Sequence, residues 1–482
     1  MTGEATLTAD QGEAAAAFAA WLQEAPRGEP FVLSGYAGTG KTFLSMRLLA
    51  LAEAAGLCWT VAAPTHKAVG VLRSHLQLAG LRPTWFPSTI HRLLRLKLKR
   101  QGDQERCEET AHTAGSLEHL GLVLIDEASM VDSTLLEITL RCAHPYATRL
   151  VFVGDPAQLP PVGEALSPVF ALARGQRAAL TQVVRHQGPV LRLASGIRSG
   201  ALPCRRPPQL PPHRTAAGMV AALDRPAWLR AAQEALQRSA ASDNPDLARI
   251  LCYTNRSLER LVPIARRALH GSMADQLPVL PGEVLITRSA VMAPACREGI
   301  EAAEEPDMVL GSNREVVVRD VTPERCDLAS FGVAVEAGLA PPLIETLSAS
   351  VDTGEATLTL RLLPPIGSAA RQQLDQVLQR LRGQAREASR QEGRGLWRRF
   401  FLLRDAFASL GPAAVLSVHR SQGSSFGEVF VDADVFWPSD PELRRQLVYV
   451  AVSRARQGVT LMADGNNPEE QRRWHTWLAE QG

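Results

Sequence analysis

Short apolar runs, each followed at once by a polar or glycine-rich turn, recur through the first third of the chain. Continuous apolarity with helical stretches between the runs predicts parallel strands that are buried on both faces. Ligands of such a sheet bind at the carboxyl ends of its strands, so polar residues at those ends are candidate site residues. The four runs cover residues 31–33, 59–61, 122–125 and 150–153.

The same pattern returns later in the chain, which predicts a second α/β domain. Its runs cover residues 250–253, 414–417, 429–431 and 459–461. A proline-rich stretch, Leu202 to Pro212, separates the two halves and is typical of a linker or a surface excursion.

Two insertions interrupt the halves. In the first, Leu94 to Arg100 alternates strictly, so a strand would put Arg95, Lys97 and Lys99 on one face and leucines on the other. The turn-forming segment 101–103 follows, which predicts a β-hairpin. The second insertion mixes short alternating strands, at 315–319 and 357–362, with an arginine-rich helix around 374–381.

The predicted fold class is therefore α/β, with two parallel-sheet domains and two insertions. We expect the first sheet domain at 1–88 and 119–190, with the hairpin insertion at 89–118. We expect the second sheet domain at 191–282 and 404–482, with the β-rich and helical insertion at 283–403.

A glycine-rich segment, residues 35–42, follows the first predicted strand and precedes an apolar helix. It fits the pattern GxxxxGK[ST], in which backbone N–H groups and a helix N-terminus converge on phosphate oxygens. Lys41 would reach the β- and γ-phosphates of ATP, and the Thr42 hydroxyl would bind Mg²⁺. A chance glycine-rich turn is the alternative, which the flanking strand and helix disfavour. The predicted ATP-binding residues here are Gly35, Ala37, Gly38, Thr39, Gly40, Lys41 and Thr42.

Two carboxylates end the third apolar run, 85 residues after Lys41. We assign Asp126 to Mg²⁺ and Glu127 to polarisation of the attacking water. The alternative is a strand that simply meets solvent at two acids. Gln158, after the next run, is a candidate to sense the γ-phosphate or to position water, although a proline-stiffened turn with Gln158 in solvent explains segment 154–161 equally well.

Composition and charge limit the classes of function that the chain can have. A chain of 482 residues is too long for one core, and 52 Lys+Arg against 50 Asp+Glu give only +2. Any nucleic-acid contact must therefore come from local basic stripes. Seven scattered cysteines without a CxxC pair predict neither a zinc site nor a disulfide framework. With no signal-peptide pattern and no apolar stretch of membrane-spanning length, we expect a cytoplasmic, reduced protein without membrane contact.

The order of these motifs resembles the superfamily 1B DNA helicases, closest to the RecD/Dda-like group. Eight elements follow in the family's order, at residues 35–42, 63–68, 89–91, 125–127, 154–159, 180–185, 418–426 and 448–455. The resemblance implies two RecA-like motor domains, a 1B hairpin and an SH3-like 2B insertion. It further implies ATP and Mg²⁺ as cofactors, with single-stranded DNA and duplex/single-strand junctions as partners.

The resemblance also assigns nucleotide contacts outside the glycine-rich loop. Arg185 and Arg454 would meet the γ-phosphate across the cleft and stabilise transition-state charge. Gly423 is placed with the ATP-binding residues. Gln11 resembles the family's adenine-reading glutamine, although Thr8 followed by Gln11 is also a capping box that opens the alanine-rich helix.

A track for the nucleic acid follows from the same family motifs. Thr hydroxyls, backbone N–H groups and lysine suit phosphates, and histidine can stack on a base, although a lone histidine is more often structural. The predicted DNA-binding residues are Pro64, Thr65, His66, Lys67, Thr89, His91, Arg95, Lys97, His419 and Ser421.

In this family the 1B hairpin forms a pin that splits the duplex. The segment 101–103 carries no aromatic residue at the expected tip, so a basic hairpin that only binds phosphate remains an alternative. The 2B insertion is a candidate surface for protein partners, and its Trp397, Phe400 and Phe401 are expected to be core residues on a helix.

The leading hypothesis is an ATP-dependent DNA helicase that moves 5′→3′ on single-stranded DNA, with hydrolysis coupled to closure of the two domains. Its polarity comes wholly from the resemblance. The rival is a nucleotide-gated clamp, or a translocase ATPase, without productive unwinding. Glu127 favours the helicase in part, because a pure clamp does not need a hydrolytic base.

Overall fold

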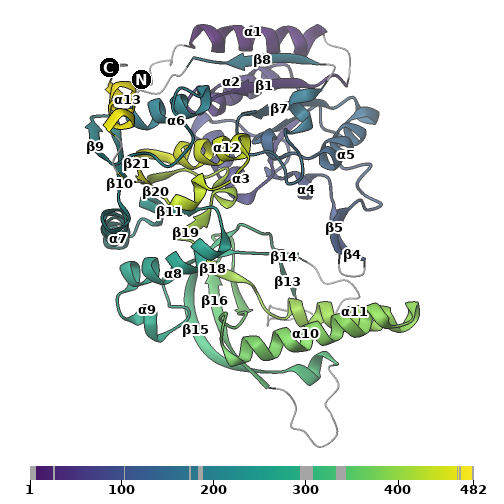
Figure 1. Ribbon diagram of the computed structural model, residues 1–482. Helices are drawn as coiled ribbons and strands as arrows, with labels where there is room; N and C mark the ends of the chain where they lie inside the picture. Colours follow the sequence, from purple (N-terminus) through teal and green to yellow (C-terminus); the bar gives the residue numbers. More distant parts are fainter. Residues whose placement is uncertain are drawn as a thin grey trace, which may run out of the picture. The chain divides into compact units, whose positions relative to one another are not determined.

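The structure is a computed structural model (Figure 1) in which two compact units can be distinguished. The first unit consists of Met1–Lys97, Cys107–Leu261 and Val415–Gly482, and the second of Leu98–Arg106 and Val262–Ala414. The residues that the structure describes are 7–24, 28–101, 104–172, 175–182, 188–293, 308–332, 343–463, 465 and 468–479.

The first unit contains a six-stranded sheet in which every pairing is parallel. Its order is β3 (Ser88–Thr89), β2 (Trp59–Ala63), β6 (Leu122–Ile125), β7 (Arg149–Gly154), β1 (Phe31–Gly35) and β8 (Gln176–Leu180). All four strands predicted in the first third of the chain are therefore confirmed. The pattern did not predict β3 or β8, because β3 has two residues and β8 is mostly exposed.

Apolar residues on alternate positions of these strands enter two different cores. Leu33, Val61 and Val153 pack with α1 (Ala9–Glu24), α2 (Lys41–Ala54) and α3 (His66–Ala79) on one face. Val32 and Phe152 pack with α4 (Ile90–Leu93) and α5 (Ser133–Ala143) on the other. Burial on both faces is the physical reason for the uninterrupted apolar runs.

A second six-stranded sheet lies in the same unit. Its order is β19 (Val415–Ser417), β11 (Ala248–Cys252), β20 (Phe426–Val431), β21 (Ala455–Met462), β10 (Gly218–Leu223) and β9 (Leu210–Thr215). Only β9 pairs antiparallel. The helices that accompany this sheet in sequence are α6 (Pro189–Ser199), α7 (Arg225–Ala241), α8 (Asn255–His270), α12 (Pro441–Ser453) and α13 (Pro468–Ala479).

The proline-rich stretch between the halves is only partly the linker that the sequence predicted. Its last residues, Leu210 to Pro212, begin the edge strand β9. Proline lacks the N–H that a sheet needs, so it is tolerated at an edge, where one side of the strand has no neighbour. A composition-based assignment cannot separate such a strand from a loop.

The second unit is built around a five-stranded antiparallel sheet. Its order is β17 (Thr357–Arg361), β16 (Leu343–Asp352), β15 (Glu315–Asp327), β12 (Val284–Thr287) and β18 (Leu410–Pro412). The unit also contains α9 (Met273–Gln276), the pair β13 (Val291–Met292) and β14 (Met308–Leu310), and two long helices that lie side by side (Figure 1), α10 (Ala369–Glu387) and α11 (Arg390–Asp405). Strands and helices of the kind that the sequence predicted for 283–403 are present, although the unit itself runs from Val262 to Ala414 and includes Leu98–Arg106.

The predicted hairpin of the first insertion is present as β4 (Lys97–Gln101) and β5 (Gln104–Glu108). The predicted strand was too long at its start. Leu94 is buried at the end of α4, and Arg95 adopts a left-handed conformation with φ 53°, so Arg95 lies before the strand. Alternation alone could not show that Leu94 belongs to the core of the sheet domain. The two residues at the tip, 102–103, lie outside the described residues.

None of the helices within the described ranges combines the length and apolar character needed to cross a bilayer.

Candidate functional site: a nucleotide pocket between two sheets

The glycine-rich loop joins the end of β1 to the start of α2. Gly38 and Gly40 have φ of 83° and 79°, in the left-handed region where a Cβ is strained. A Cβ at Gly35 would lie 2.8 Å from the Thr39 hydroxyl, which donates to the Tyr36 carbonyl. The fold of the loop therefore depends on its glycines.

Lys41 reaches back into this loop. Its ammonium donates to the carbonyls of Gly35 at 2.8 Å and Tyr36 at 2.9 Å. Burial lowers the pKa of Lys41, whereas the carboxylates of Asp155, Glu127 and Asp126 raise it, and the charge of Arg454 lowers it. In the parallel sheet β7 is the neighbour of β1 and β6 is the neighbour of β7, so the acids that follow these strands lie at the same edge of the sheet as the loop.

The two acids after β6 are held in a constrained turn. Glu127 has φ 52°, which is unusual for a residue with a side chain, and its backbone N–H donates to Asp126 Oδ1 at 2.8 Å. Burial, and then the charge of Glu127, raise the pKa of Asp126 to about 7. Such strain and charge crowding persist where the surrounding structure enforces them, as at many functional sites.

The donor set fits Mg²⁺. Thr42 and Asp126 offer a hydroxyl and a carboxylate, which are the hard oxygen ligands that Mg²⁺ takes while it keeps several waters. Gln158, which follows β7, is 5% exposed, and its Oε1 has no hydrogen-bond donor among the described residues. A buried acceptor without a donor is costly, so this oxygen is suited to a water or a ligand.

Tyr449 of α12, which belongs to the second sheet, enters the pocket of the first. Its hydroxyl donates to Asp155 Oδ2 at 2.6 Å and accepts from the backbone N–H of Ala37 at 3.0 Å. Burial, and then the charge of Asp155, raise the pKa of the Tyr449 phenol, so the hydroxyl remains a donor. One hydroxyl thus connects the glycine-rich loop, the end of β7 and the second sheet.

Two further residues strengthen this connection. Arg198 of α6 places a guanidinium nitrogen 3.5 Å from Asp155 Oδ1, and its Cζ lies 3.2 Å from the centre of the Tyr36 ring. Gln422 donates from Nε2 to the Leu159 carbonyl at 3.2 Å. We call Tyr449, Arg198 and Asp155 the bridge.

The structure describes one of the two predicted arginines, Arg454. Arg454 is 6% exposed and donates to the carbonyls of Val450 and Ser424, both at 3.2 Å, while its charge acts on Lys41. It therefore lies on the second-sheet side of the pocket, within electrostatic reach of the loop. Arg185 lies outside the described residues.

Gln11 forms a capping box with Thr8, which is one of the two roles that the sequence predicted for this residue. The Thr8 N–H donates to Gln11 Oε1 at 3.2 Å, and the Gln11 N–H donates to the Thr8 hydroxyl at 3.3 Å. Its Nε2 also donates to the carbonyl of Thr39 in the glycine-rich loop, at 2.9 Å. The capping box is confirmed, and the adenine contact stays a prediction.

The predicted DNA residues after β2 stand at the start of α3. Thr65 caps the helix by accepting from the Ala68 N–H, and Pro64 and His66 flank it. Lys67 lies 3.6 Å from Asp246 and 4.9 Å from the centre of the Phe426 ring, both of which accompany the second sheet. This end of α3 is thus a second place where the two sheets meet.

The next predicted contacts surround α4 and the hairpin. Thr89 caps α4 through the Arg92 N–H, and burial lowers the pKa of His91, while the charge of Asp132 raises it. Arg95 and Lys97 are exposed on the path into the hairpin.

On the second sheet, the predicted contacts follow β19. His419 lies 6.1 Å from the Tyr253 ring, and burial lowers its pKa. Ser421 is fully buried and donates to the Val418 carbonyl at 2.7 Å, so in this conformation its hydroxyl holds the turn. Gly423 has φ 73°, and a Cβ there would lie 3.3 Å from the Thr65 hydroxyl, which puts this glycine beside α3.

Sequence reasoning did not assign a role to the bridge. Asp155 and Tyr449 lie inside quoted motifs, but nothing in their spacing shows that they meet, because 294 residues separate them. Arg198 lies on a helix with no motif. The apolar run 150–153 followed by Gly154-Asp155 is the one sequence signal that pointed here, and the structure shows that the acid is completely buried.

Two family models match the chain. The model described as an AAA domain covers residues 6–204, which include the glycine-rich loop and the first sheet. The model described as a UvrD-like helicase C-terminal domain covers residues 412–462, which include β19 to β21.

Among characterised relatives, the chain is similar to the ATP-dependent DNA helicase dda of Enterobacteria phage T4, with 24% identity over 434 residues, 89% of this chain and 93% of that protein. It is 35% identical over 175 residues to the ATP-dependent RecD2 DNA helicase of Deinococcus radiodurans, covering 36% of this chain and 22% of that one. It is 38% identical over 192 residues to the RecBCD enzyme subunit RecD of Mycolicibacterium smegmatis, covering 35% and 33%. A solved Pif1 helicase from Bacteroides in complex with ADP-AlF3 and ssDNA is 15% identical, with TM-score 0.48 over 97% of this chain and 94% of that one.

Two RecA-like sheets, the first of which carries a GxxxxGK[ST] loop after β1, are the architecture of an ATPase of the P-loop class. Within that class the relatives point to one group. The chain is similar to superfamily 1B helicases of the RecD/Dda type, and its residues 6–204 and 412–462 match the two family models.

Proposed function

We propose that this protein is an ATP-dependent DNA helicase that moves 5′→3′ along single-stranded DNA and couples ATP hydrolysis to closure of its two sheets. The activity named for the T4 and Deinococcus relatives supports the helicase assignment. The 5′→3′ direction rests on the resemblance to superfamily 1B helicases.

The observation that carries the proposal is the position of Tyr449. A residue from the second sheet hydrogen-bonds a backbone amide of the glycine-rich loop, at Ala37, and a buried acid of the first sheet, Asp155. A contact of this kind depends on what occupies the loop, so nucleotide binding and cleavage change the free energy of the contact between the sheets. That dependence is what a motor needs in order to convert hydrolysis into movement.

Each residue of the proposed site has a separate role in ATP hydrolysis. Thr42 and Asp126 would hold Mg²⁺, which neutralises charge on the phosphates when bound. Glu127 accepts a proton from the attacking water, and the partnerless Oε1 of Gln158 orients that water by accepting its hydrogen. Lys41 and Arg454 stabilise the negative charge that develops on the phosphoryl oxygens.

The proposed path of the strand follows the second place where the sheets meet. Thr65, His66 and Lys67 at the start of α3 lie on the first sheet's side, and His419 lies on the second. Because the sheets meet here as well as at the nucleotide, closure at one place shifts contacts at the other. We therefore expect single-stranded DNA to stimulate hydrolysis.

The test is unwinding of duplexes that carry a single-stranded tail at either the 5′ or the 3′ end, with and without ATP. We expect strand separation only with ATP and only from the 5′-tailed substrate. The Lys41→Ala variant is the matched negative control. ATP turnover without separation of either substrate would refute the helicase assignment, and separation of only the 3′-tailed substrate would refute the polarity.

A further inference from the structure

The helices α10 and α11 of the second unit concentrate positive charge in one place. Between Ala369 and Asp405 the chain carries nine arginines, no lysine and four carboxylates, a net charge of +5. The whole chain carries +2, so the remaining residues together carry −3. The near-neutral composition therefore hides one strongly basic element.

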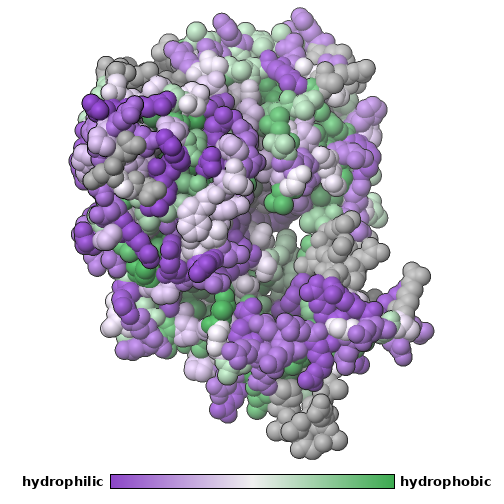
Figure 2. Space-filling model, viewed as in Figure 1, coloured by the Kyte–Doolittle hydropathy of each residue, from purple (hydrophilic) through white to green (hydrophobic). Residues whose placement is uncertain are grey.

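Most of these arginines face solvent. Arg371 pairs with Asp375 and Arg404 with Asp405, near the ends of the helices that join the sheet. Figure 2 shows a hydrophilic surface over the α10–α11 pair. The exposed members are Arg380, Arg382, Arg386, Arg394, Arg398 and Arg399. Four of them make no ion pair with any residue in the described ranges, namely Arg380, Arg394, Arg398 and Arg399.

The amphipathic pattern of the helices keeps the arginines outside. Leu374, Leu381 and Ala385 are the buried positions of α10, spaced by seven and four residues, so they form one stripe. A Cβ at Gly393 of α11 would lie 3.2 Å from the Ala385 carbonyl oxygen, which shows how closely the helices approach. The apolar stripe packs between the helices and the sheet, which leaves the basic side exposed and able to bind a partner.

A solvated charged face would normally mix both signs, because repulsion among like charges opposes folding. Here two of the four carboxylates pair with arginines at the base, and the six exposed arginines outnumber the other two carboxylates, Glu387 and Glu392. The exclusive use of arginine adds information, since a guanidinium binds phosphate oxygens through two parallel N–H groups, which an ammonium cannot do. Phosphodiester groups are the anions that fit this chemistry.

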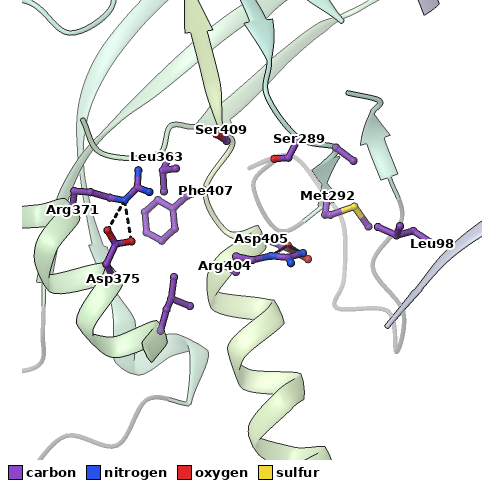
Figure 3. Close-up of a pocket in the computed structure, with 12 residues that line it drawn as sticks. Leu98, Ser289, Met292, Leu363, Arg371, Asp375, Arg404, Asp405, Phe407 and Ser409 are labelled. Atoms are coloured by element: carbon purple, nitrogen blue, oxygen red, sulfur yellow. Dashed lines mark hydrogen bonds and ion pairs between the residues drawn. The ribbon is translucent and has the colours of Figure 1, made fainter. Parts of the chain in front are cut away.

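A cavity at the base of the helices connects this element to the hairpin of the first insertion. Leu98 of β4 lines a cavity of about 220 Å³ together with Met292, Leu363 and Phe407 (Figure 3). Arg371 and Asp375 line the same cavity, and the Arg371 Nε–H donates to both carboxylate oxygens of Asp375, at 2.9 and 3.0 Å. The basic helices and the hairpin expected to part the duplex therefore share one compact unit.

We propose that the exposed arginines of α10 and α11 bind the phosphate backbone of duplex DNA ahead of the hairpin. The inference rests on the proposed helicase function and adds to it a second DNA surface, separate from the single-strand path. Contacts to phosphate alone are independent of base sequence, which suits an enzyme that must advance along any duplex.

The test replaces the four arginines that make no ion pair, in the variant Arg380→Gln/Arg394→Gln/Arg398→Gln/Arg399→Gln. Each lost phosphate contact lowers the slope of log Kd against log salt by about 0.9, so four contacts predict a fall of up to about 3.6 on blunt duplex. We expect Kd for that duplex at ~0.1 M salt to rise at least ~10-fold. Binding of a short single-stranded oligonucleotide, and the ATPase activity that it stimulates, should match the parent.

Two variants serve as controls. The matched change of four exposed arginines elsewhere, Arg82→Gln/Arg214→Gln/Arg225→Gln/Arg230→Gln, removes the same charge and should leave the duplex salt slope unchanged. The lysine version of the test variant keeps the charge and should keep most of the slope, which separates charge loss from misfolding.

An unchanged duplex Kd and salt slope in the glutamine variant would overturn the proposal. An equal loss on single strands and on duplex would overturn the assignment to duplex, because the arginines would then belong to the single-strand path. If the parent shows no DNA-stimulated ATPase activity, the proposed function fails while the salt slopes can still be measured, so the two failures are distinguishable.

Discussion

Removal of one oxygen atom should uncouple the nucleotide pocket from DNA. The variant Tyr449→Phe keeps the buried ring and loses the hydroxyl that donates to Asp155 and accepts from the Ala37 N–H. No other described side chain hydrogen-bonds both the glycine-rich loop and the end of β7. The variant therefore weakens communication between the sheets without altering the residues that carry the chemistry.

The expected size follows from the partners that remain. A hydrogen bond to a charged group contributes about 1.5–3 kcal/mol. Asp155 keeps the Ala157 N–H at 3.0 Å and Arg198 at 3.5 Å, so its carboxylate is not left unpaired. We therefore expect a loss of about 2 kcal/mol in the contact between the sheets. Since about 1.4 kcal/mol corresponds to a tenfold change, this is roughly 30-fold in the equilibrium between joined and parted sheets.

The assay is steady-state ATP hydrolysis with and without a saturating single-stranded oligonucleotide. We expect the ratio of the two rates to fall by up to ~30-fold in Tyr449→Phe, while the rate without DNA changes little. Tyr146→Phe is the matched control, because Tyr146 is 38% exposed and lies outside every motif. A Tyr449→Phe protein that folds like the parent and keeps its stimulation within twofold would show that the bridge does not carry the coupling.

Three other changes test separate parts of the structure. Lys41→Ala should abolish ATP hydrolysis and leave nucleotide-free DNA binding nearly intact, as measured by oligonucleotide anisotropy; normal turnover would mean that the loop is misassigned. Glu127→Gln should slow hydrolysis by about 10²–10⁴-fold with ATP binding retained, as expected for loss of a general base; rates near those of the parent would assign the base elsewhere. Glu283→Ala should lower the free energy of unfolding of the second unit by about 3–5 kcal/mol, since it leaves the buried guanidinium of Arg266 without the carboxylate that it contacts at 2.8 and 3.1 Å; a thermal or denaturant transition unchanged from the parent would contradict this estimate.

Local pattern was sufficient for the sheets and for the glycine-rich loop. The apolar runs at β1, β2, β6 and β7 were readable because each strand is buried on both faces. Strands such as β8 and β9, exposed or at an edge, lack that signature and escaped prediction. The predicted hairpin strand began three residues too early, at Leu94 instead of Lys97, for the related reason that Leu94 belongs to the core of the sheet domain rather than to the alternating strand.

The basic segments of the chain were also predicted from short stretches of sequence. An overall +2 pointed to local basic stripes, and the sequence singled out Arg95 to Lys99. The sequence also predicted an arginine-rich helix around 374–381, but only the structure showed that the apolar stripe of α10 is covered and that arginines of α10 and α11 are left exposed.

The sequence by itself determined that a phosphate-binding loop follows a buried strand and that acids end the neighbouring strands, because both are properties of consecutive residues. Only the tertiary structure decided that Tyr449, Arg198 and Asp155 meet at that loop. Their contact depends on two separately folded sheets coming together, and a pairing across hundreds of residues leaves no periodic trace along the chain. The physical reason is that local propensities act within a few residues, whereas a shared pocket is set by the packing of whole domains.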